Sequence, residues 1–267
     1  MSRLLLILVL LLPGLAHAGA LPAAEDLMKK ATADRDFSSS VQSLSLQQHK
    51  GDAPGATVRV RSWTRQLDDG TRMARMEVDA PSDYAGMRML TVEPGEGSER
   101  AGGSWVLWPG QKVVTGGQEY NPRAAFLRTD FAMEDMRMDE FDTGQHRVTG
   151  EGWLRVGDKD LPVWHIEIVP AADSGSAYTR VLAQLDKEHL LPRRVELLGK
   201  GGKAYKELTV LRTELVDGAL LPMESQMKDL RRGTRTVLTI DDIDLDVPAA
   251  RVPESIFTPD SLLTPAE

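Results

Sequence analysis

The residue types that most often carry enzyme chemistry are present in this sequence, but they are not grouped into a catalytic pattern. After the first eighteen residues the chain has four histidines, His49, His146, His165 and His189. A zinc site of the H-E-x-x-H type needs two histidines four residues apart on one helix, and no two of these lie within five positions of each other. His165 stands between two apolar residues of a predicted strand, which favours a half-buried strand position over a ligand.

Nucleophilic and phosphate-binding motifs are also missing from the sequence. Ser104 and Ser176 each follow a glycine, but neither stands in the Gly-x-Ser-x-Gly pattern of a nucleophile turn. Gly201-Gly202-Lys203 matches only the last letters of a phosphate loop and is expected to join two strands. The chain has no cysteine, which excludes thiol catalysis, thiolate metal sites and disulfides. We therefore expect no catalytic residue, no metal, no cofactor and no enzymatic activity.

Two groups of carboxylates are candidate binding sites. Asp241, Asp242, Asp244 and Asp246 form the densest group, but they lack the glycine and terminal glutamate of a calcium loop. They are predicted to form the wet face and end of an edge strand, where charge discourages aggregation. Glu134-Asp135 is a neighbouring pair, and neighbours on a helix point apart, so a role at the positive end of a helix dipole is the simpler interpretation.

Composition indicates an ordinary globular domain. The 267 residues are 41% hydrophobic and 27% charged, with a formal net charge of -8. A chain of this length buries enough surface to fold without disulfide or metal support. The acidic balance argues against nucleic acid as a partner, because that partner requires a basic surface.

The N-terminus reads as an export signal. Arg3 supplies a positive charge, residues 4–12 are an unbroken apolar run, and Ala16-His17-Ala18 places small residues at the positions that a signal peptidase reads. The apolar run spans about 14 Å of helix, against roughly 30 Å for a bilayer core, so a membrane anchor is disfavoured. A lipid anchor would need a cysteine at the cleavage site. We predict a signal peptide over 1–18 and a soluble, non-lipidated periplasmic protein with a single domain over 19–267.

Hydrophobic periodicity predicts an antiparallel β protein. A short helix is expected over 21–33, and period-two alternation begins at Val58, giving a hairpin of strands 58–67 and 71–78. Leu-Pro pairs at 161–162, 191–192 and 221–222 recur every thirty residues, and each is expected to open a strand of a meander. Residues 121–141 interrupt the β pattern, with Thr129 or Asp130 expected to cap a short helix that acts as a lid.

Tryptophan and methionine form a surplus of large, soft apolar side chains. Methionine is unbranched and polarizable, so it suits surfaces that repack around variable acyl chains. In a curled half-barrel such residues would line a ligand cavity. The alternative is that they fill the core, and composition does not separate the two interpretations.

Two segments resemble a known family. The run from Trp105 to Val113, WVLWPGQKV, resembles the "W-x-W/Y-x-P-x-x-K/R-V" strand pair of periplasmic outer-membrane lipoprotein-sorting proteins. The run from Arg128 to Met136, RTDFAMEDM, resembles that family's "G-S/T-D-F-S/T-Y-E-D-L", with Arg128 at the usual small residue and Met133 at the usual aromatic. The resemblance covers most of the chain after the predicted signal peptide.

The resemblance implies the fold and function of the LolA and LolB lipoprotein carriers. That fold is mainly β: an incomplete, strongly curled antiparallel β-barrel of about ten or eleven strands, with short α-helices forming a lid over a hydrophobic cavity. The implied role is a periplasmic carrier that moves the acyl chains of lipoproteins, or another lipid, from the inner toward the outer membrane. Implied partners are this cargo, an inner-membrane exporter of ABC or RND type and an outer-membrane acceptor, with transient membrane contact.

The same resemblance suggests site residues. Residues expected to line the cavity and lid are Trp63, Met89, Trp105, Trp108, Phe131, Met133 and Met136. The lid motif is Thr129, Asp130, Glu134 and Asp135, and Arg61 or Arg65 is the candidate latch by strand position.

Two other functions stay open at this point. The same fold in an RseB-like envelope sensor or adaptor binds a membrane protein partner. An enzyme acting on envelope lipids is the least favoured alternative, since no catalytic constellation is present.

Overall fold

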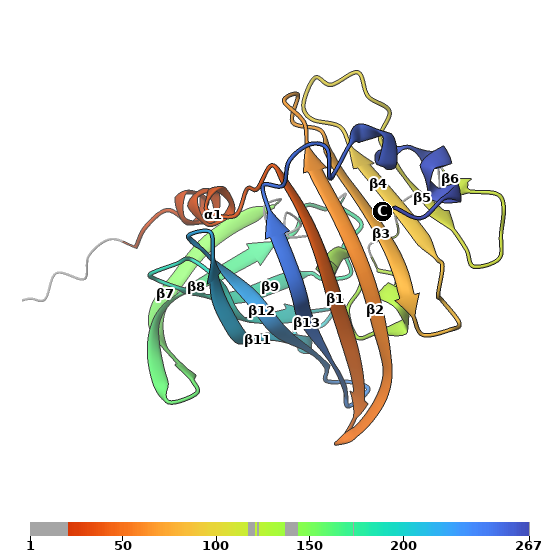
Figure 1. Ribbon diagram of the computed structural model, residues 1–267. Helices are drawn as coiled ribbons and strands as arrows, with labels where there is room; N and C mark the ends of the chain where they lie inside the picture. The colour runs from red at the N-terminus through yellow and green to blue at the C-terminus, as the bar shows by residue number, and fades with distance from the viewer. Residues whose placement is uncertain (1–20, 117–120, 122, 137–143, 173, 267) are drawn as a thin grey trace, which may run out of the picture.

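The computed structural model describes residues 21–116, 121, 123–136, 144–172 and 174–266, and the predicted signal peptide lies outside them. Within these residues the chain forms one antiparallel sheet of thirteen strands in the order β6-β5-β4-β3-β2-β1-β13-β12-β11-β10-β9-β8-β7. The sheet curls strongly, but its edge strands β6 and β7 do not pair with each other, so it stays open (Figure 1). The prediction of a mainly β, curled, incompletely closed antiparallel sheet is therefore confirmed.

The bounds of the strands are β1 (Ser39–Lys50), β2 (Ala53–Gln66), β3 (Arg72–Ala80), β4 (Arg88–Glu93), β5 (Gly103–Leu107), β6 (Thr115–Gly116), β7 (Gln145–Val156), β8 (Lys159–Val169), β9 (Arg180–Asp186), β10 (Pro192–Leu198), β11 (Ala204–Val216), β12 (Ala219–Asp229) and β13 (Thr234–Leu245). The hairpin predicted from alternation is β2–β3, in which Arg65 lies opposite Met73. Thirteen strands exceed the expected ten or eleven. Serine and glutamine occupy most positions of β1, so its alternation is weak, and β6 has only two residues.

Two details of the predicted meander are wrong. The pairs Leu161-Pro162 and Leu221-Pro222 lie inside β8 and β12, and only Pro192 begins a strand. Pro222 lies next to an irregularity in the β11–β12 register, where a missing backbone donor is tolerated. The four aspartates from Asp241 to Asp246 lie at the end of β13 and are exposed, but β13 is a central strand and not an edge.

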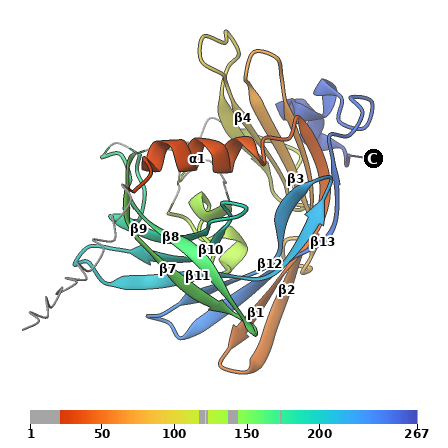
Figure 2. The same cartoon turned by 90° about the vertical axis from the view of Figure 1, so that its left-hand side faces the viewer.

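The predicted N-terminal helix is confirmed as α1 (Ala24–Ala33). Glu25 and Asp26 lie in its first turn and Lys30 in its last, as the helix dipole favours. Its buried side chains, which include Met28 and Ala31, pack on the apolar cluster inside the curl. Figure 2 shows α1 lying across the open side of the sheet, where it contacts β7. No helix among the described residues is both long enough and apolar enough to cross a membrane.

Strand alternation divides the apolar residues of the sheet into two clusters on opposite faces. The concave face carries the larger cluster, to which both halves of the sheet contribute, for example Leu46 and Val60 from one half and Ile166 and Val195 from the other. The convex face of β2 to β5 carries the second cluster, which includes Trp63 and Leu90.

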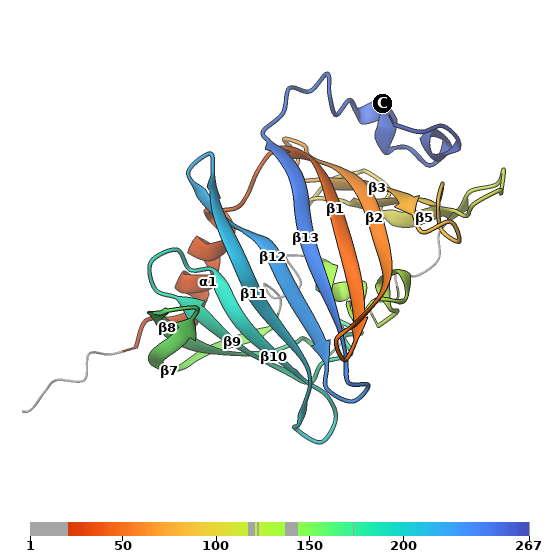
Figure 3. The same ribbon diagram turned by 60° about the horizontal axis from the view of Figure 1, so that its bottom comes forward.

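The C-terminal segment covers this second cluster (Figure 3). It forms two 3₁₀ turns, η4 (Glu254–Phe257) and η5 (Pro259–Leu263), and buries Phe257 and Leu262 against the sheet. Beneath it Arg75 is 1% exposed and donates to the carbonyl oxygens of Ile256, Ser261 and Thr264 at 3.1, 3.2 and 2.5 Å.

Glu77 completes this polar contact. One of its carboxylate oxygens accepts two hydrogen bonds from Arg75, at 2.6 and 3.1 Å, and one from the backbone N–H of Ala266 at 2.7 Å. Because the pair is buried, its charges are stabilised by each other and by the C-terminal backbone. The C-terminal segment is therefore fixed by a buried ion pair as well as by apolar contact.

Replacing Arg75 tests this account. Arg75→Met removes four hydrogen bonds to the C-terminal segment and takes away the cation closest to buried Glu77, so we expect the free energy of unfolding to fall by about 3 kcal/mol or more. Limited proteolysis should cut within residues 248–266 sooner than in the unmodified protein. The matched control is Arg59→Met, since Arg59 is exposed on the neighbouring strand. An Arg75→Met variant with unchanged stability and unchanged protection of this segment would contradict the account.

Candidate functional site: a segment anchored inside the sheet

Residues 123–136, called here the inner segment, lie inside the curl of the sheet (Figure 2). Phe126, Leu127 and Phe131 belong to the concave apolar cluster, and Met133 and Met136 are partly buried against it. The segment therefore supplies the middle of the core that both halves of the sheet share.

The inner segment is a tight loop closed by its own backbone. Phe126 N–H donates to the carbonyl of Phe131 at 2.8 Å, and Met133 N–H donates to the carbonyl of Ala124 at 2.8 Å. Leu127 and Arg128 turn the chain with φ of 46° and 63°, in the left-handed region that favours glycine. Arg128 is the position at which the resembled motif carries a small residue, and this backbone conformation gives the physical reason.

The short helix predicted after Thr129 is not formed. The segment has two 3₁₀ turns, η1 (Phe126–Arg128) and η2 (Glu134–Met136), separated by extended residues. The Thr129 hydroxyl donates to the carbonyl of Phe126 at 2.7 Å and does not cap a helix. The predicted helical lid is thus a loop packed against the concave face, because Phe126 and Phe131 gain more from burial there than a short helix would give.

Asp130 anchors the loop to β13. Its carboxylate accepts hydrogen bonds from the hydroxyls of Thr234 and Thr236, at 2.5 and 2.8 Å. Its backbone N–H donates to the Thr236 hydroxyl at 3.0 Å. Arg232 lies 3.7 Å from the same carboxylate. Asp130 is 5% exposed and Thr236 is fully buried, so these bonds are shielded from water.

Glu134 anchors the end of the loop to the segment that precedes β9. It accepts a hydrogen bond from the Ser176 hydroxyl at 2.6 Å and one from the backbone N–H of Ala177 at 3.0 Å. Glu134 is 1% exposed. Burial raises the pKa of its carboxyl above the ordinary value, and the two hydrogen bonds oppose that shift in part.

Asp135 joins a buried network that reaches β11. Its carboxylate accepts hydrogen bonds from the Tyr178 hydroxyl at 2.6 Å and from Lys206 Nζ at 3.1 Å. Burial raises the pKa of the Tyr178 hydroxyl well above its usual range, and the adjacent Asp135 charge adds to the shift. Tyr205 packs beside Tyr178 with ring centroids 5.7 Å apart, and burial raises the pKa of Tyr205 to about 12. Both phenols therefore stay protonated at neutral pH.

All four residues of the predicted lid motif lie together in the inner segment. Asp130, Glu134 and Asp135 anchor the segment to other parts of the chain, whereas the Thr129 hydroxyl donates within the segment. The helix-dipole interpretation of Glu134 and Asp135 is wrong, because each carboxylate binds a partner far along the chain. Sequence reasoning missed the partners Ser176, Tyr178 and Lys206, which no local pattern connects to this motif. Thr234 and Thr236 carry a weak signal, since they alternate on one face of a single strand.

The seven residues predicted to line one cavity are divided between two faces. Met89, Phe131, Met133 and Met136 lie with the concave cluster. Trp63 and Trp105 belong to the convex cluster beneath the C-terminal segment, and Trp108 is 43% exposed. Trp63 follows Val58 and Val60 at odd spacing on β2, so alternation turns it to the opposite face.

Neither candidate latch is placed to hold the inner segment. Arg61 lies on the convex side of β2, where it binds Asp79 at 3.0 Å and Glu77 at 3.3 Å. Arg65 donates to the carbonyl of Val252 at 3.0 Å and so holds the C-terminal segment. In the described part of the chain, Lys206 and Arg232 are the cations next to the inner segment's carboxylates.

The described residues hold no cluster of three or more histidine or carboxylate side chains suited to a metal ion. What the inner segment can do is physical: its anchors are hydrogen bonds and one buried ion pair, which break without covalent change. Its aromatic residues cover an apolar surface to which both halves of the sheet contribute.

The curled open sheet, with an apolar segment packed in its concave face, defines a protein with the LolA-like fold. Residues 70–264 match a family model described as "uncharacterized protein", and the chain belongs to that family. The predicted resemblance to the lipoprotein-sorting proteins is confirmed for the fold by solved structures with the same architecture. No curated protein matches the sequence.

Three crystal structures illustrate this likeness. A DUF1329 family protein from Desulfovibrio piger has a TM-score of 0.78 at 21% identity, over 90% of this chain and 97% of that one. An outer-membrane lipoprotein-sorting protein domain from Vibrio parahaemolyticus has a TM-score of 0.76 at 20% identity, over 90% and 98%. A LolA superfamily protein from Nitrosomonas europaea has a TM-score of 0.67 at 18% identity, over 89% and 98%. At such identities the likeness establishes the fold alone.

Removing the Asp130 carboxylate should loosen the inner segment. Asp130→Ala leaves the buried Thr236 hydroxyl and the Thr234 hydroxyl without their acceptor, so we expect a loss of about 2–3 kcal/mol in the free energy of unfolding. Urea unfolding measures it. Asp158→Ala is the control, since the Asp158 side chain is fully exposed, and it should change stability by less than about 0.5 kcal/mol. A loss as small as the control's would show that this anchor does not hold the segment.

Glu134 should give the protein a defined pH dependence. The pKa of Glu134 is raised above its ordinary value of 4.5, so the folded state binds this proton more tightly than the unfolded state does. The free energy of unfolding therefore falls as pH rises from 4.5 through the raised pKa. Glu134→Gln cannot ionise, so the stability of the variant minus that of the unmodified protein should increase across this window and be flat below it.

Urea unfolding at a series of pH values measures this difference. Glu99→Gln, at an exposed position, corrects for the loss of one surface carboxylate. A difference that decreases with rising pH would mean that the native structure favours the charged form of Glu134.

Proposed function

We propose that this protein is a non-enzymatic periplasmic carrier that binds the acyl chains of lipoproteins, or of another lipid, on the concave face of its sheet. The observation that carries the proposal is the inner segment. Phe126 and Phe131 cover the apolar concave face, and polar groups that release without chemistry hold them there. In this proposal an acyl chain takes the place of the inner segment's apolar side chains.

Physical chemistry supports this exchange. Each CH₂ group removed from water contributes about 0.8 kcal/mol, so an acyl chain needs a continuous apolar surface during transit. Four partly buried methionines pack on the concave cluster: Met76 and Met89 from the sheet, and Met133 and Met136 from the inner segment. Their flexible thioether side chains adapt to chains of different shape.

The proposed location and partners follow from the same role. A signal peptide over residues 1–18 would export the protein to the periplasm, and the absence of cysteine leaves it without a site for N-terminal lipidation. Cargo would be received from an inner-membrane exporter and passed to an outer-membrane acceptor.

The proposal is tested with a fluorescent fatty acid and with a variant that weakens one anchor. If ligand and inner segment compete for the same surface, loosening the segment must strengthen ligand binding. Tyr178→Phe removes the hydroxyl that binds Asp135 but keeps the ring, which weakens the anchor by about 1 kcal/mol. We expect the affinity for the probe to rise by up to about fivefold.

Tyr205→Phe is the matched control. Its ring lies beside that of Tyr178, but its hydroxyl takes no part in the hydrogen bonds that hold residues 130–135 in the described structure. It should leave the affinity for the probe unchanged. No uptake of the probe by the unmodified protein, together with no lipid in native mass spectra of material from the periplasm, would refute the carrier proposal. Capture of one membrane protein without any lipid would instead indicate an adaptor.

A further inference from the structure

One end of the sheet collects exposed basic residues. The turns over residues 50–53, 199–203 and 229–234 lie together there, because Lys50 pairs with Thr234 and Asp229 pairs with Lys206 in the strand ladders (Figure 3). These three turns are called here the basic end. Their acidic residues are Asp52 and Asp229, and their cations, all exposed, are Lys50, Lys200, Lys203, Arg231 and Arg232. Positive charge is thus in local excess in a protein whose formal net charge is -8.

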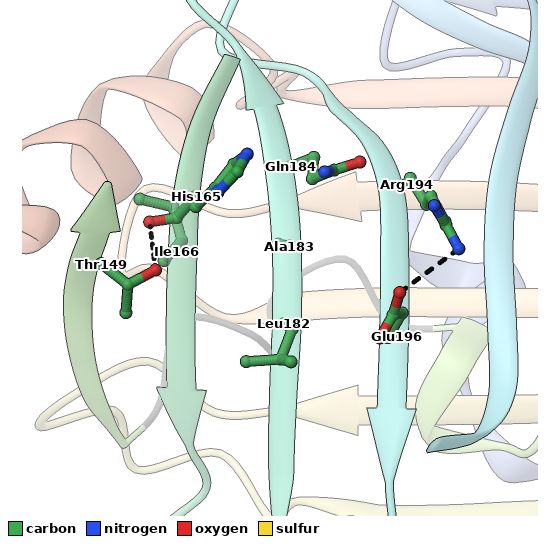
Figure 4. Close-up of a pocket in the computed structure, with 8 residues that line it drawn as sticks. All are labelled: Thr149, His165, Ile166, Leu182, Ala183, Gln184, Arg194 and Glu196. Carbon is green, nitrogen blue, oxygen red and sulfur yellow. Dashed lines mark hydrogen bonds and ion pairs between the residues drawn. The ribbon is translucent and has the colours of Figure 1, made fainter. Parts of the chain in front are cut away.

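The lysines of the basic end have no carboxylate beside them. Lys50, Lys200 and Lys203 form no ion pair in the described part of the chain. Arg194, farther along β10, shows the opposite arrangement, because it pairs with Glu196 at 3.3 Å (Figure 4). An unpaired surface charge acts on an external partner over about 8 Å at physiological salt. The basic end therefore attracts an anionic surface that comes close to it, although the protein as a whole is acidic.

The turn between β12 and β13 also presents an apolar side chain. Leu230 is 51% exposed, and the exposed Arg231 and Arg232 follow it directly. The backbone N–H of Leu230 donates to the carbonyl of Tyr205 at 2.8 Å. The Asp229 carboxylate accepts hydrogen bonds from the backbone N–H groups of both arginines at 2.9 Å. Leu230 is thus held outward on a fixed turn, where burial in a partner would remove it from water.

An anionic lipid bilayer matches both features of the basic end. Its phosphates lie at the surface and its acyl chains begin directly below them. A leucine beside two arginines can therefore enter the acyl boundary while the guanidinium groups stay with the phosphates. A nucleic acid would pair with the cations but offers no apolar layer for Leu230.

We propose that the basic end is a docking surface for a bilayer that contains anionic phospholipids. The inference rests on the proposed function, since a carrier must meet the membranes between which it moves cargo. The same end holds an anchor of the inner segment: Arg232, with its side chain 59% exposed, lies 3.7 Å from Asp130, and Thr234 binds that carboxylate at 2.5 Å. A docked bilayer lies next to this anchor.

Cosedimentation with vesicles tests the docking surface. We expect the purified protein to bind vesicles of phosphatidylcholine mixed with phosphatidylglycerol, to bind phosphatidylcholine alone far more weakly, and to lose the difference at high salt. Lys200→Gln and Lys203→Gln together should weaken binding to the mixed vesicles by about fivefold for each lysine. Leu230→Ser keeps the charge but removes the apolar contact, so it should weaken binding by about threefold or more.

The matched control combines Lys29→Gln with Lys159→Gln, which changes the net charge by the same amount. Both lysines are exposed, and they lie on α1 and at the start of β8, away from the basic end (Figure 3). Binding should stay unchanged, and a loss equal to that of the Lys200 and Lys203 variant would overturn the proposal. Absence of binding to the mixed vesicles would overturn it too. Polyglutamate that binds the protein when these vesicles do not would assign the surface to an acidic protein instead.

The outcomes for the docking surface and for the carrier are distinguishable. The variant at Lys200 and Lys203 keeps every residue of the inner segment and of the concave cluster, so it should take up the fluorescent fatty acid as the unmodified protein does. Unmodified protein that takes up the fatty acid but binds no vesicles overturns the docking surface alone. Charge-dependent vesicle binding without fatty-acid uptake supports the docking surface and counts against the carrier.

Discussion

The structure depends on one constraint: a single sheet of thirteen strands has two faces, and no second sheet covers either of them in the described part of the chain. Apolar residues on both faces must still leave water. On the concave side the curl brings Leu46 and Val60 of one half toward Ile166 and Val195 of the other, and the inner segment and α1 complete the core. On the convex side an apolar cluster lies over β2 to β5, and the C-terminal segment covers it.

Both covering segments are fixed by buried charge, but the two arrangements differ in a way that bears on function. Arg75 and Glu77 lie in the sheet and bind mainly the backbone of the C-terminal segment, so one ion pair holds several points of the chain. The carboxylates of the inner segment lie in the covering segment itself, and each binds a different part of the chain: β13, the segment before β9, or Tyr178 together with β11. The three anchors of the inner segment are separate, so they can release one after another. The C-terminal segment is instead held at one buried ion pair, Arg75–Glu77.

Much of the fold could be predicted from the sequence, because alternation and turn residues are local signals. The β2–β3 hairpin, α1 and the open curled sheet all follow from such signals together with the family resemblance. β1 could not be predicted in the same way, since Ser and Gln at most of its positions hide the apolar pair Leu44 and Leu46. Strand number therefore depends on tertiary contact that the local pattern does not contain.

The site was predicted less completely, for a physical reason. Composition identifies tryptophan as apolar but does not say which face of a sheet it occupies. Trp63 lies at an odd spacing from Val58 and Val60 on β2, so its side chain points away from the concave core. The motif from Thr129 to Asp135 is visible in the sequence, but its partners Tyr178 and Lys206 are more than forty residues away. Only the register of the whole sheet brings them together.

Reversible binding on the concave face requires the inner segment and its competitor to be held with similar free energies. Seven hydrogen bonds join the carboxylates and backbone of Asp130, Glu134 and Asp135 to the sheet and its loops. At about 1 kcal/mol each they contribute roughly 7 kcal/mol in sum. An acyl chain that buries ten CH₂ groups gains roughly 8 kcal/mol. Phe126, Leu127 and Phe131 add their own burial to the inner segment's side of this comparison. In the proposed exchange an acyl chain must therefore cover more apolar surface than those three side chains do in order to displace the segment.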